Sequence, residues 1–187
     1  MNYRNDIISY IEAEKRALDS LNISSIDSAI NLIYEAYERE GTIYIFGNGG
    51  SAATASHYQN DFNKGLSEKP EKKFRVCCLN NDLPTLTAIA NDISFDEVFR
   101  FQMKGRIKPG DIVIAISGSG NSQNVINAVE YAREQGNQVI GLCGYSGGRL
   151  KQLSDVTIHV NVDNMQLTED IHMMLDHLMV TVFMKYL

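Results

Sequence analysis

Four side chains that can transfer protons occur in two pairs at helical spacing. His57 and Asp61 are four residues apart in a segment whose pattern predicts a helix, so both should project from one face. Glu169 and His177 are eight apart in the last helical segment, on about the same side two turns on. Imidazole and carboxylate groups serve as general acids and bases, so these four are the candidates for moving a proton within a substrate.

Two turns rich in glycine and serine could hold an anionic group. The first, "GNGGS", contributes Asn48, Gly49, Gly50 and Ser51, and the second, "SGSGNS", contributes Ser117, Gly118, Ser119 and Ser122. Each follows an apolar, strand-like run and precedes a helical segment. Glycines let the backbone approach an anion, serines donate hydroxyl groups, and a helix start presents free N–H groups. The second turn therefore predicts a site for a phosphate monoester.

The first turn also satisfies a dinucleotide-binding pattern, with Gly47, Gly49 and Ala52 at the required spacing. That fold needs an acidic residue about 20 residues beyond the glycines, at the end of the second strand. The nearest candidate at that strand end is Asp82, which comes far too late, and neither turn carries the lysine of a triphosphate-binding loop. A nucleotide site is therefore disfavoured. The plainer alternative, two tight turns without a ligand, stays open.

Strand-like and helical segments alternate along most of the chain. Helical patterns cover residues 3–20 and 25–40, with Ser24 or Ser25 as the cap and Gly41 as the stop, and a last helix covers 165–186. The strand-like runs are "TIYIFG", "FRVCCL", "DIVIAIS", "QVIGLCG" and "VTIHV", and segments such as "SFDEVFRFQMKGR" between them are helical in pattern. Near-continuous apolar strands predict an α/β fold with a doubly wound parallel sheet covered on both faces, a three-layer architecture. In the strand order 2-1-3-4-5, both turns would face one pocket.

Length, net charge and cysteine content limit which classes of protein the sequence can encode. The chain has 187 residues, about the size of one domain, and its net charge of −6 includes no basic run of the kind that binds nucleic acid or a membrane surface. It contains neither a leader pattern nor 18 consecutive apolar residues. Three cysteines, an odd number, lie in apolar runs and act as small hydrophobic residues. We expect a cytoplasmic protein without a membrane span.

Three stretches carry a family resemblance. "GNGGSAA", "AIANDISF" and "ISGSGNSQNVINAVEYAREQGNQVIGLCGYSGGRL" resemble the sugar isomerase (SIS) family, and most closely its phosphoheptose isomerase branch. The similarity extends over nearly the whole chain and implies one SIS domain over 1–187. It also implies a five-stranded parallel sheet and a homotetramer whose active sites form between subunits, with residues 1–40 used in oligomerisation.

The activity that the resemblance implies is an aldose–ketose isomerisation. Sedoheptulose 7-phosphate would become a glycero-manno-heptose 7-phosphate, through an enediolate, for surface-polysaccharide synthesis. Such a reaction needs a base, an acid and a group that steadies the enediolate.

Matching positions to the family assigns roles to the site residues. Ser117, Ser119 and Ser122 match the phosphate-binding serines, Asn48 and Ser51 match contacts to the sugar, and Asp92 matches the aspartate of an Asn-Asp pair. The family places four zinc ligands at the positions of His57, Asp61, Glu169 and His177. The residue at position 61 is its general base, and the histidine at position 177 is its acid.

The chain departs from the family at three of these positions. Asp61 replaces a glutamate, which withdraws the base by about 1.5 Å, and Glu169 replaces a glutamine. An added anionic ligand would hold zinc more tightly and make it a weaker Lewis acid. Lys64 and Gly65 stand where the family has a glycine and an arginine, and a lysine cannot reproduce the planar fork of arginine donors.

These departures keep other interpretations open. His57 could make only a local hydrogen bond within its helix, and Asp61 could pair with Lys64 on the surface. The chain could then be a noncatalytic SIS module, an adaptor or sugar-phosphate sensor that binds a protein partner. The resemblance favours the isomerase, with a sugar phosphate as ligand and zinc as cofactor.

Overall fold

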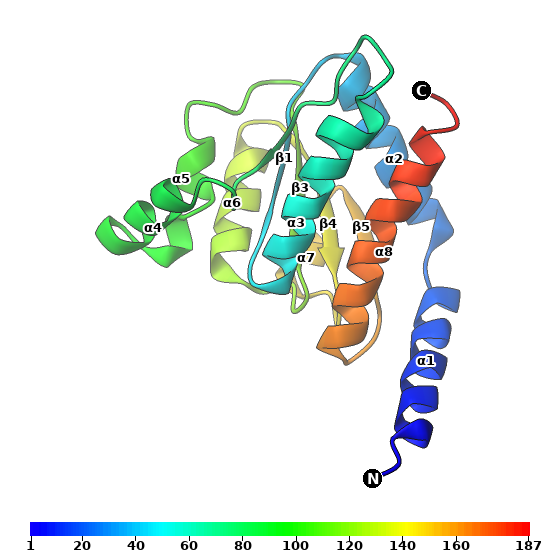
Figure 1. Ribbon diagram of the computed structural model, residues 1–187. Helices are drawn as coiled ribbons and strands as arrows, with labels where there is room; N and C mark the ends of the chain where they lie inside the picture. Colours follow the sequence, from blue (N-terminus) through cyan, green and yellow to red (C-terminus); the bar gives the residue numbers. More distant parts are fainter.

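A five-stranded parallel sheet forms the centre of the computed structural model, which describes residues 1–187 (Figure 1). The strands are β1 (Ile43–Gly47), β2 (Val76–Cys78), β3 (Ile112–Ser117), β4 (Gln138–Cys143) and β5 (Val156–His159). They pair in parallel in the order β2-β1-β3-β4-β5. The strands and the strand order expected from the sequence are confirmed.

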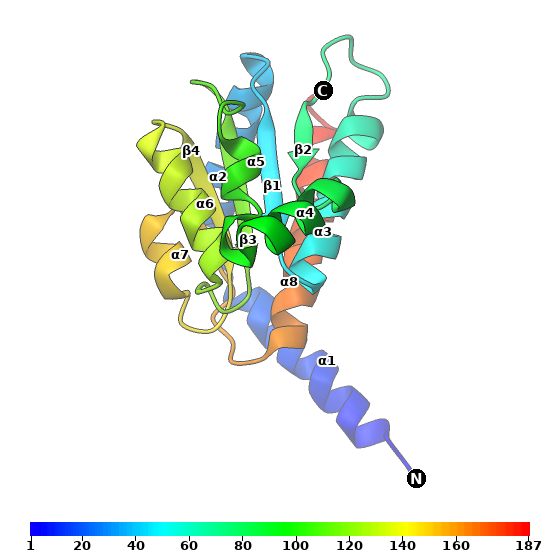
Figure 2. The same ribbon diagram turned by 90° about the vertical axis from the view of Figure 1, so that its left-hand side faces the viewer.

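Helices cover both faces of the sheet. They are α1 (Arg4–Asp19), α2 (Ile23–Glu38), α3 (Gly50–Asn60), α4 (Leu83–Asp92), α5 (Arg100–Met103), α6 (Gln123–Glu134), α7 (Gly148–Leu153) and α8 (Met165–Phe183). A π-helical turn, η1 (Asp61–Leu66), continues α3, and a 3₁₀ turn, η2 (Phe95–Glu97), precedes α5. Helices α2, α3 and α8 lie on one face, whereas α4, α5, α6 and α7 lie on the other (Figures 1 and 2). The predicted three-layer arrangement is therefore present.

Alternation along each strand explains the two hydrophobic layers. In β1, Ile43 and Ile45 pack into the core beneath α2, α3 and α8, while Tyr44 and Phe46 pack into the core beneath α6. Successive side chains of a strand point to opposite faces, so a sheet covered on both sides requires apolar residues at nearly every position. This is why the strands read as continuous apolar runs.

Some helix boundaries differ from the sequence expectation. The N-cap of α2 is Asn22, whose side chain accepts a hydrogen bond from the Ser25 backbone N–H at 3.1 Å, and not Ser24 or Ser25. An asparagine oxygen caps as well as a serine hydroxyl, so the helix starts two residues earlier than predicted. The segment "SFDEVFRFQMKGR" forms two short helical pieces, η2 and α5, rather than one helix.

Helix α1 extends away from the sheet and its flanking layers (Figures 1 and 2). The Tyr10 hydroxyl donates a hydrogen bond to the Asp170 carboxylate of α8, and Ala17 is the one buried residue of the helix. Ile7, Ile8 and Ile11 are exposed. Helix α1 thus carries apolar side chains that no other part of this chain covers. None of the helices combines the length and apolar character needed to cross a membrane.

Candidate active site

The two predicted turns meet at the carboxyl edge of the sheet, around a cavity of about 150 Å³. Gly47 at the end of β1 pairs in register with Ile116 of β3, which brings the turns that follow these strands side by side. The cavity is lined by Asn48 and Ser51 of the first turn, Ser117, Gly118, Ser119 and Ser122 of the second, and Ile116, Met165 and Glu169. Strand order reverses between β1 and β3, which is where open α/β sheets bind ligands.

The second turn forms a ring of hydroxyl and amide groups before α6. The hydroxyl oxygens of Ser117 and Ser122 lie 3.1 Å apart, and the Asn121 backbone N–H donates to the Ser119 hydroxyl at 3.2 Å. Ser122 is the N-cap of α6, a helix of 12 residues, so the positive end of its dipole points toward the cavity. This arrangement suits a phosphate group.

An asparagine pair ties the two turns together. Asn48 and Asn124 exchange two side-chain hydrogen bonds, each 2.9 Å long, and Asn124 is buried. The paired amides fix the side chain of Asn48 at the edge of the cavity. Asn124 was not predicted from the sequence, although a polar residue so near the start of an otherwise apolar helix face is a signal.

Glycines make room for Glu169 at the start of α3. Gly49 is the N-cap of α3 and has φ of +56°, a conformation that side chains disfavour. A Cβ atom at Gly50 would stand 2.3–2.5 Å from the carboxylate atoms of Glu169. The Glu169 carboxylate therefore lies against the first turn of α3, inside the cavity that the two turns form.

Two acidic residues considered in the sequence lie outside this cavity. Asp92 is exposed at the C-terminal end of α4, where its side chain accepts a hydrogen bond from Asn91 at 2.7 Å. Asp82 is the N-cap of α4 and accepts from the Thr85 backbone N–H at 3.2 Å. Asp82 therefore serves as a helix cap and lies outside the cavity, where it cannot bind the ribose of a dinucleotide.

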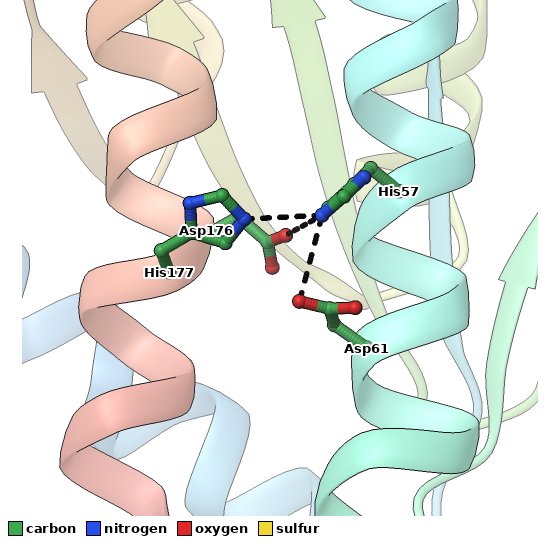
Figure 3. Close-up of side chains that lie close together, drawn as sticks. All are labelled: His57, Asp61, Asp176 and His177. Atoms are coloured by element: carbon green, nitrogen blue, oxygen red, sulfur yellow. Dashed lines mark hydrogen bonds and ion pairs between the residues drawn. The ribbon is translucent and has the colours of Figure 1, made fainter.

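A second group of polar side chains lies between α3 and α8 (Figure 3). His57 and Asp61 come from α3 and its junction with η1, and Asp176 and His177 come from α8. The Nε2 atom of His57 lies 3.1 Å from Nε2 of His177, 3.5 Å from Oδ2 of Asp61 and 3.7 Å from Oδ2 of Asp176. All four potential ligand atoms lie within 4.8 Å of one another. We call these residues the His-Asp cluster.

The cluster contains three of the four residues that the sequence assigned to zinc. Asp176 is the fourth, and Glu169 lies in the cavity instead. Asp176 was missed, although a signal existed. It falls on the buried stripe of α8, at the spacing of Ile171, His172, Leu175 and Met179, where an unpaired carboxylate is rare.

The environment of Asp176 is unusual for a carboxylate. Its side chain has 0% exposure, and neither oxygen has a hydrogen-bond partner. Burial raises the pKa of the Asp176 carboxyl to about 7, and the negative charge of Asp61 acts in the same direction. A carboxylate in this position requires a proton or a cation.

Contacts around the cluster remove two of the plainer interpretations. Lys64 pairs with Glu68 at 2.8 Å and not with Asp61, so Asp61 is not tied up in a surface ion pair with that lysine. His57 bridges to another helix, so its interactions are not confined to its own. The Lys64 ammonium also points to Glu68 rather than standing in for the arginine of the family pattern.

The other two histidines belong to the framework. His172 is buried, and burial lowers its pKa to about 4, an effect that the backbone of Cys143 partly opposes. His159 ends β5 and its Nε2 lies 2.8 Å from the Tyr145 carbonyl oxygen. Neither residue takes part in the cavity or the His-Asp cluster.

Comparisons with known proteins agree on one family. The model of the SIS domain family matches residues 4–144. The probable phosphoheptose isomerase of Thermoplasma acidophilum is 38% identical over 173 residues, which is 92% of this chain and 94% of that protein. The phosphoheptose isomerase of Helicobacter pylori strain P12 is 35% identical over 174 residues, which is 93% of this chain and 90% of that protein.

Solved structures give the same result. The phosphoheptose isomerase GmhA from Neisseria gonorrhoeae superposes with a TM-score of 0.90 at 30% identity, covering 98% of this chain and all 100% of that chain. A phosphoheptose isomerase from Francisella tularensis also reaches 0.90, at 27% identity, covering 98% of both chains. The chain therefore belongs to the SIS domain family, in the branch formed by the phosphoheptose isomerases.

Proposed function

We propose that the protein is a phosphosugar aldose–ketose isomerase that converts sedoheptulose 7-phosphate to a glycero-manno-heptose 7-phosphate. The observation that carries the proposal is that a phosphate-type turn at the start of α6 and an acid–base cluster both lie beside α3 and α8, the turn through the cavity that it shares with them. The curated relatives in this branch bear the name phosphoheptose isomerase, over most of their length.

The spacing of the two groups favours a long, open-chain substrate. Glu169 in the cavity and His177 in the cluster are eight residues apart on α8, which corresponds to about 12 Å along the helix axis. A ligand whose phosphate lies at the second turn and whose carbonyl end reaches the His-Asp cluster must be extended. A seven-carbon ketose phosphate is of this kind.

In this proposal the two turns bind and orient the substrate. Ser117, Ser119 and Ser122 donate hydroxyl hydrogen bonds to the phosphate, together with backbone N–H groups at the start of α6. Asn48, fixed by Asn124, and Ser51 hold hydroxyl groups of the sugar. Gly49, Gly50 and Gly118 shape the two turns so that the backbone can approach the ligand closely.

Residues of the His-Asp cluster transfer the protons in this proposal. The Asp61 carboxylate removes a proton from the hydroxyl-bearing carbon beside the carbonyl, which gives an enediolate, and His177 donates a proton to the former carbonyl oxygen. The protonated Asp61 then returns its proton to the former carbonyl carbon while His177 takes the proton of the neighbouring hydroxyl, which completes the aldose and restores both groups. Both residues lie between α3 and α8, where His57 contacts each of them (Figure 3). Glu169 is placed to contact the sugar between the phosphate and the cluster.

The cluster also suits a zinc ion. Two imidazole nitrogens and two carboxylates form a donor set that zinc accepts, and the partnerless, buried carboxylate of Asp176 is explained by a cation beside it. When bound, zinc would act as a Lewis acid that polarises the substrate carbonyl and stabilises negative charge on its oxygen.

The assembly and setting of the protein form part of the same proposal. The chain is one SIS domain over 1–187, and residues 1–40 join four copies into a homotetramer, which the uncovered isoleucines of α1 support. A cavity of about 150 Å³ is small for a heptose phosphate, so a neighbouring subunit would complete it, and Asp92 would contribute from such a surface. The enzyme works in the cytoplasm.

A product assay tests the proposal. Purified protein, with and without added zinc, is incubated with sedoheptulose 7-phosphate, and the aldose phosphate is quantified by NMR or chromatography. Turnover by the wild type and a loss of roughly a hundredfold or more in Asp61→Asn would support the assignment. Binding of the ketose phosphate without conversion, in either condition, would contradict it and favour a noncatalytic sensor or adaptor.

A further inference from the structure

We propose that Asp176, rather than Glu169, is the second carboxylate ligand of the metal site in this chain. The inference rests on the metal-binding part of the proposed function, but not on catalysis, because it concerns which side chains hold the ion. It assigns Glu169 to the sugar-phosphate cavity alone.

The three distances from His57 Nε2 to the other members of the His-Asp cluster are close to the edge of a zinc tetrahedron. Ligand atoms that lie 2.0–2.2 Å from a tetrahedral zinc ion stand about 3.3–3.6 Å from one another. The Nε2 atom of His57 lies 3.1, 3.5 and 3.7 Å from atoms of His177, Asp61 and Asp176 respectively. Asp176 therefore lies close enough to His57 for the two side chains to share an ion.

The burial of Asp176 is the second, independent observation. Both carboxylate oxygens are buried without a hydrogen-bond partner, and the side chain points into the cluster (Figure 3). Removing a carboxylate from water without a partner is costly, and such groups are normally paired or coordinated to a metal. Of the groups around Asp176, His57 is the one that forms an ion-pair contact with it, at 3.7 Å. A cation among the four side chains would satisfy the carboxylate.

Glu169 is placed for a different task. It lies about 12 Å from His177 along α8, estimated from the helical rise, and its carboxylate rests against Gly50 in the cavity. The positive end of the α3 dipole lies there, which favours a carboxylate without any metal. Two carboxylates on one helix thus face two different parts of the site.

Metal affinity in two matched variants tests the assignment. Zinc affinity is measured by competition with a chromophoric chelator, and zinc content by elemental analysis, in full-length wild type, Asp176→Asn and Glu169→Gln. Both substitutions remove one negative charge from the same helix. The proposal predicts more than a hundredfold weaker zinc binding in Asp176→Asn and less than threefold in Glu169→Gln. The reverse ranking, or equal affinities in all three proteins, would overturn it.

A cobalt(II) experiment separates a ligand from a residue that only positions His57. In Asp176→Cys, a thiolate bound to cobalt would give a near-ultraviolet charge-transfer band that cobalt-loaded wild type lacks. Wild type is a stringent control because it already contains Cys77, Cys78 and Cys143. The band is expected in Asp176→Cys, and its absence from a folded, cobalt-loaded variant would refute direct ligation.

Thermal unfolding guards against a misfolded variant. Asp176→Leu removes a buried carboxylate, so the metal-free variant should melt at a higher temperature than metal-free wild type, while zinc should no longer raise its melting temperature. A variant that zinc still stabilises as strongly as wild type would contradict the proposal.

None of these three measurements depends on isomerase activity. A protein that binds zinc through Asp176 but converts no ketose phosphate would therefore overturn the proposed function and leave the ligand assignment intact.

Discussion

The Nε2 atoms of His57 and His177 lie 3.1 Å apart, although 120 residues separate them in the chain. One comes from α3, which follows β1, and the other from α8, the last helix, and the two helices pack side by side on one face of the sheet. The fold thereby joins a histidine near the phosphate-type turns to a histidine at the far end of the sequence. The proposed chemistry depends on this contact.

Ser119 provides a test of the phosphate site. In Ser119→Ala we expect binding of the sugar phosphate to weaken by roughly 10–100-fold, because a hydrogen bond to a charged group contributes about 1.5–3 kcal/mol. Calorimetry with sedoheptulose 7-phosphate measures the effect. Ser146→Ala is the matched control, since Ser146 lies in the turn after β4 and does not line the cavity. Equal losses in both variants would argue against a specific role for the second turn.

Gly50 tests the position of Glu169. An alanine at position 50 would place its Cβ 2.3–2.5 Å from the Glu169 carboxylate, so that side chain must move away. Because the end of a flexible side chain can move, Gly50→Ala should fold, but we expect the catalytic efficiency, kcat/KM, to fall by roughly 10–100-fold.

Gly65→Ala is the control for this substitution, because nothing lies within 4 Å of the Cβ it would introduce. It should keep both stability and activity. Wild-type kinetics in Gly50→Ala would show that the position of Glu169 is irrelevant to turnover.

His172 predicts a pH dependence of stability. Its pKa is lowered to about 4 by burial, whereas an unfolded histidine titrates near 6.5, so between these values the unfolded state binds a proton that the native state does not. Stability therefore falls as the pH falls through this range. This one group should cost about 2 kcal/mol between pH 7 and pH 5.

The variant His172→Met isolates that contribution. Urea unfolding of wild type and variant at pH 7 and pH 5 gives their free energies of unfolding. Titrating groups other than His172 contribute equally to both proteins, so their contributions cancel in the difference between the two. We expect the stability of the variant relative to wild type to rise by about 2 kcal/mol on going from pH 7 to pH 5. A difference independent of pH would mean that His172 titrates normally in the native protein.

A charge introduced on helix α1 tests the proposed assembly. Ile11 is exposed on α1, and in Ile11→Glu we expect the proposed homotetramer to dissociate, because a buried, unpaired charge at an interface is costly. Light scattering coupled to size-exclusion chromatography measures the mass. Ser9→Glu adds the same charge to the same helix at an exposed polar position and should leave the mass unchanged. A monomeric wild type would contradict the assembly itself.

The sheet was predictable from the sequence because its central strands, β1, β3 and β4, are buried on both faces over nearly their whole length. Short, β-branched runs such as "IVIAIS" that alternate with helical segments favour strands of a parallel sheet, and the two turns meet because parallel strands end at one edge. Helix ends were less predictable. Asn22 and the two serines after it are all competent caps, and only the path of the chain decides between them.

The site could be predicted in part. The spacing of His57 and Asp61 fixes their common face, but which residues of α8 meet them depends on how that helix is rotated against α3. That rotation is set by packing of the apolar stripe that includes Ile171 and Leu175, and it turns Asp176 inward. The family resemblance assigned Glu169 to the zinc ligands, whereas in the structure Glu169 lines the cavity, two turns of α8 away from His177.

Solvent-proton exchange tests the central claim most directly. The protein is incubated with sedoheptulose 7-phosphate in deuterated water, with zinc, and carbon-bound deuterium and heptose phosphate are followed by NMR. We predict deuterium at the carbons beside the carbonyl in wild type and none above background in Asp61→Asn. Absence of exchange in wild-type protein that demonstrably binds the sugar phosphate would contradict enediolate chemistry at this site.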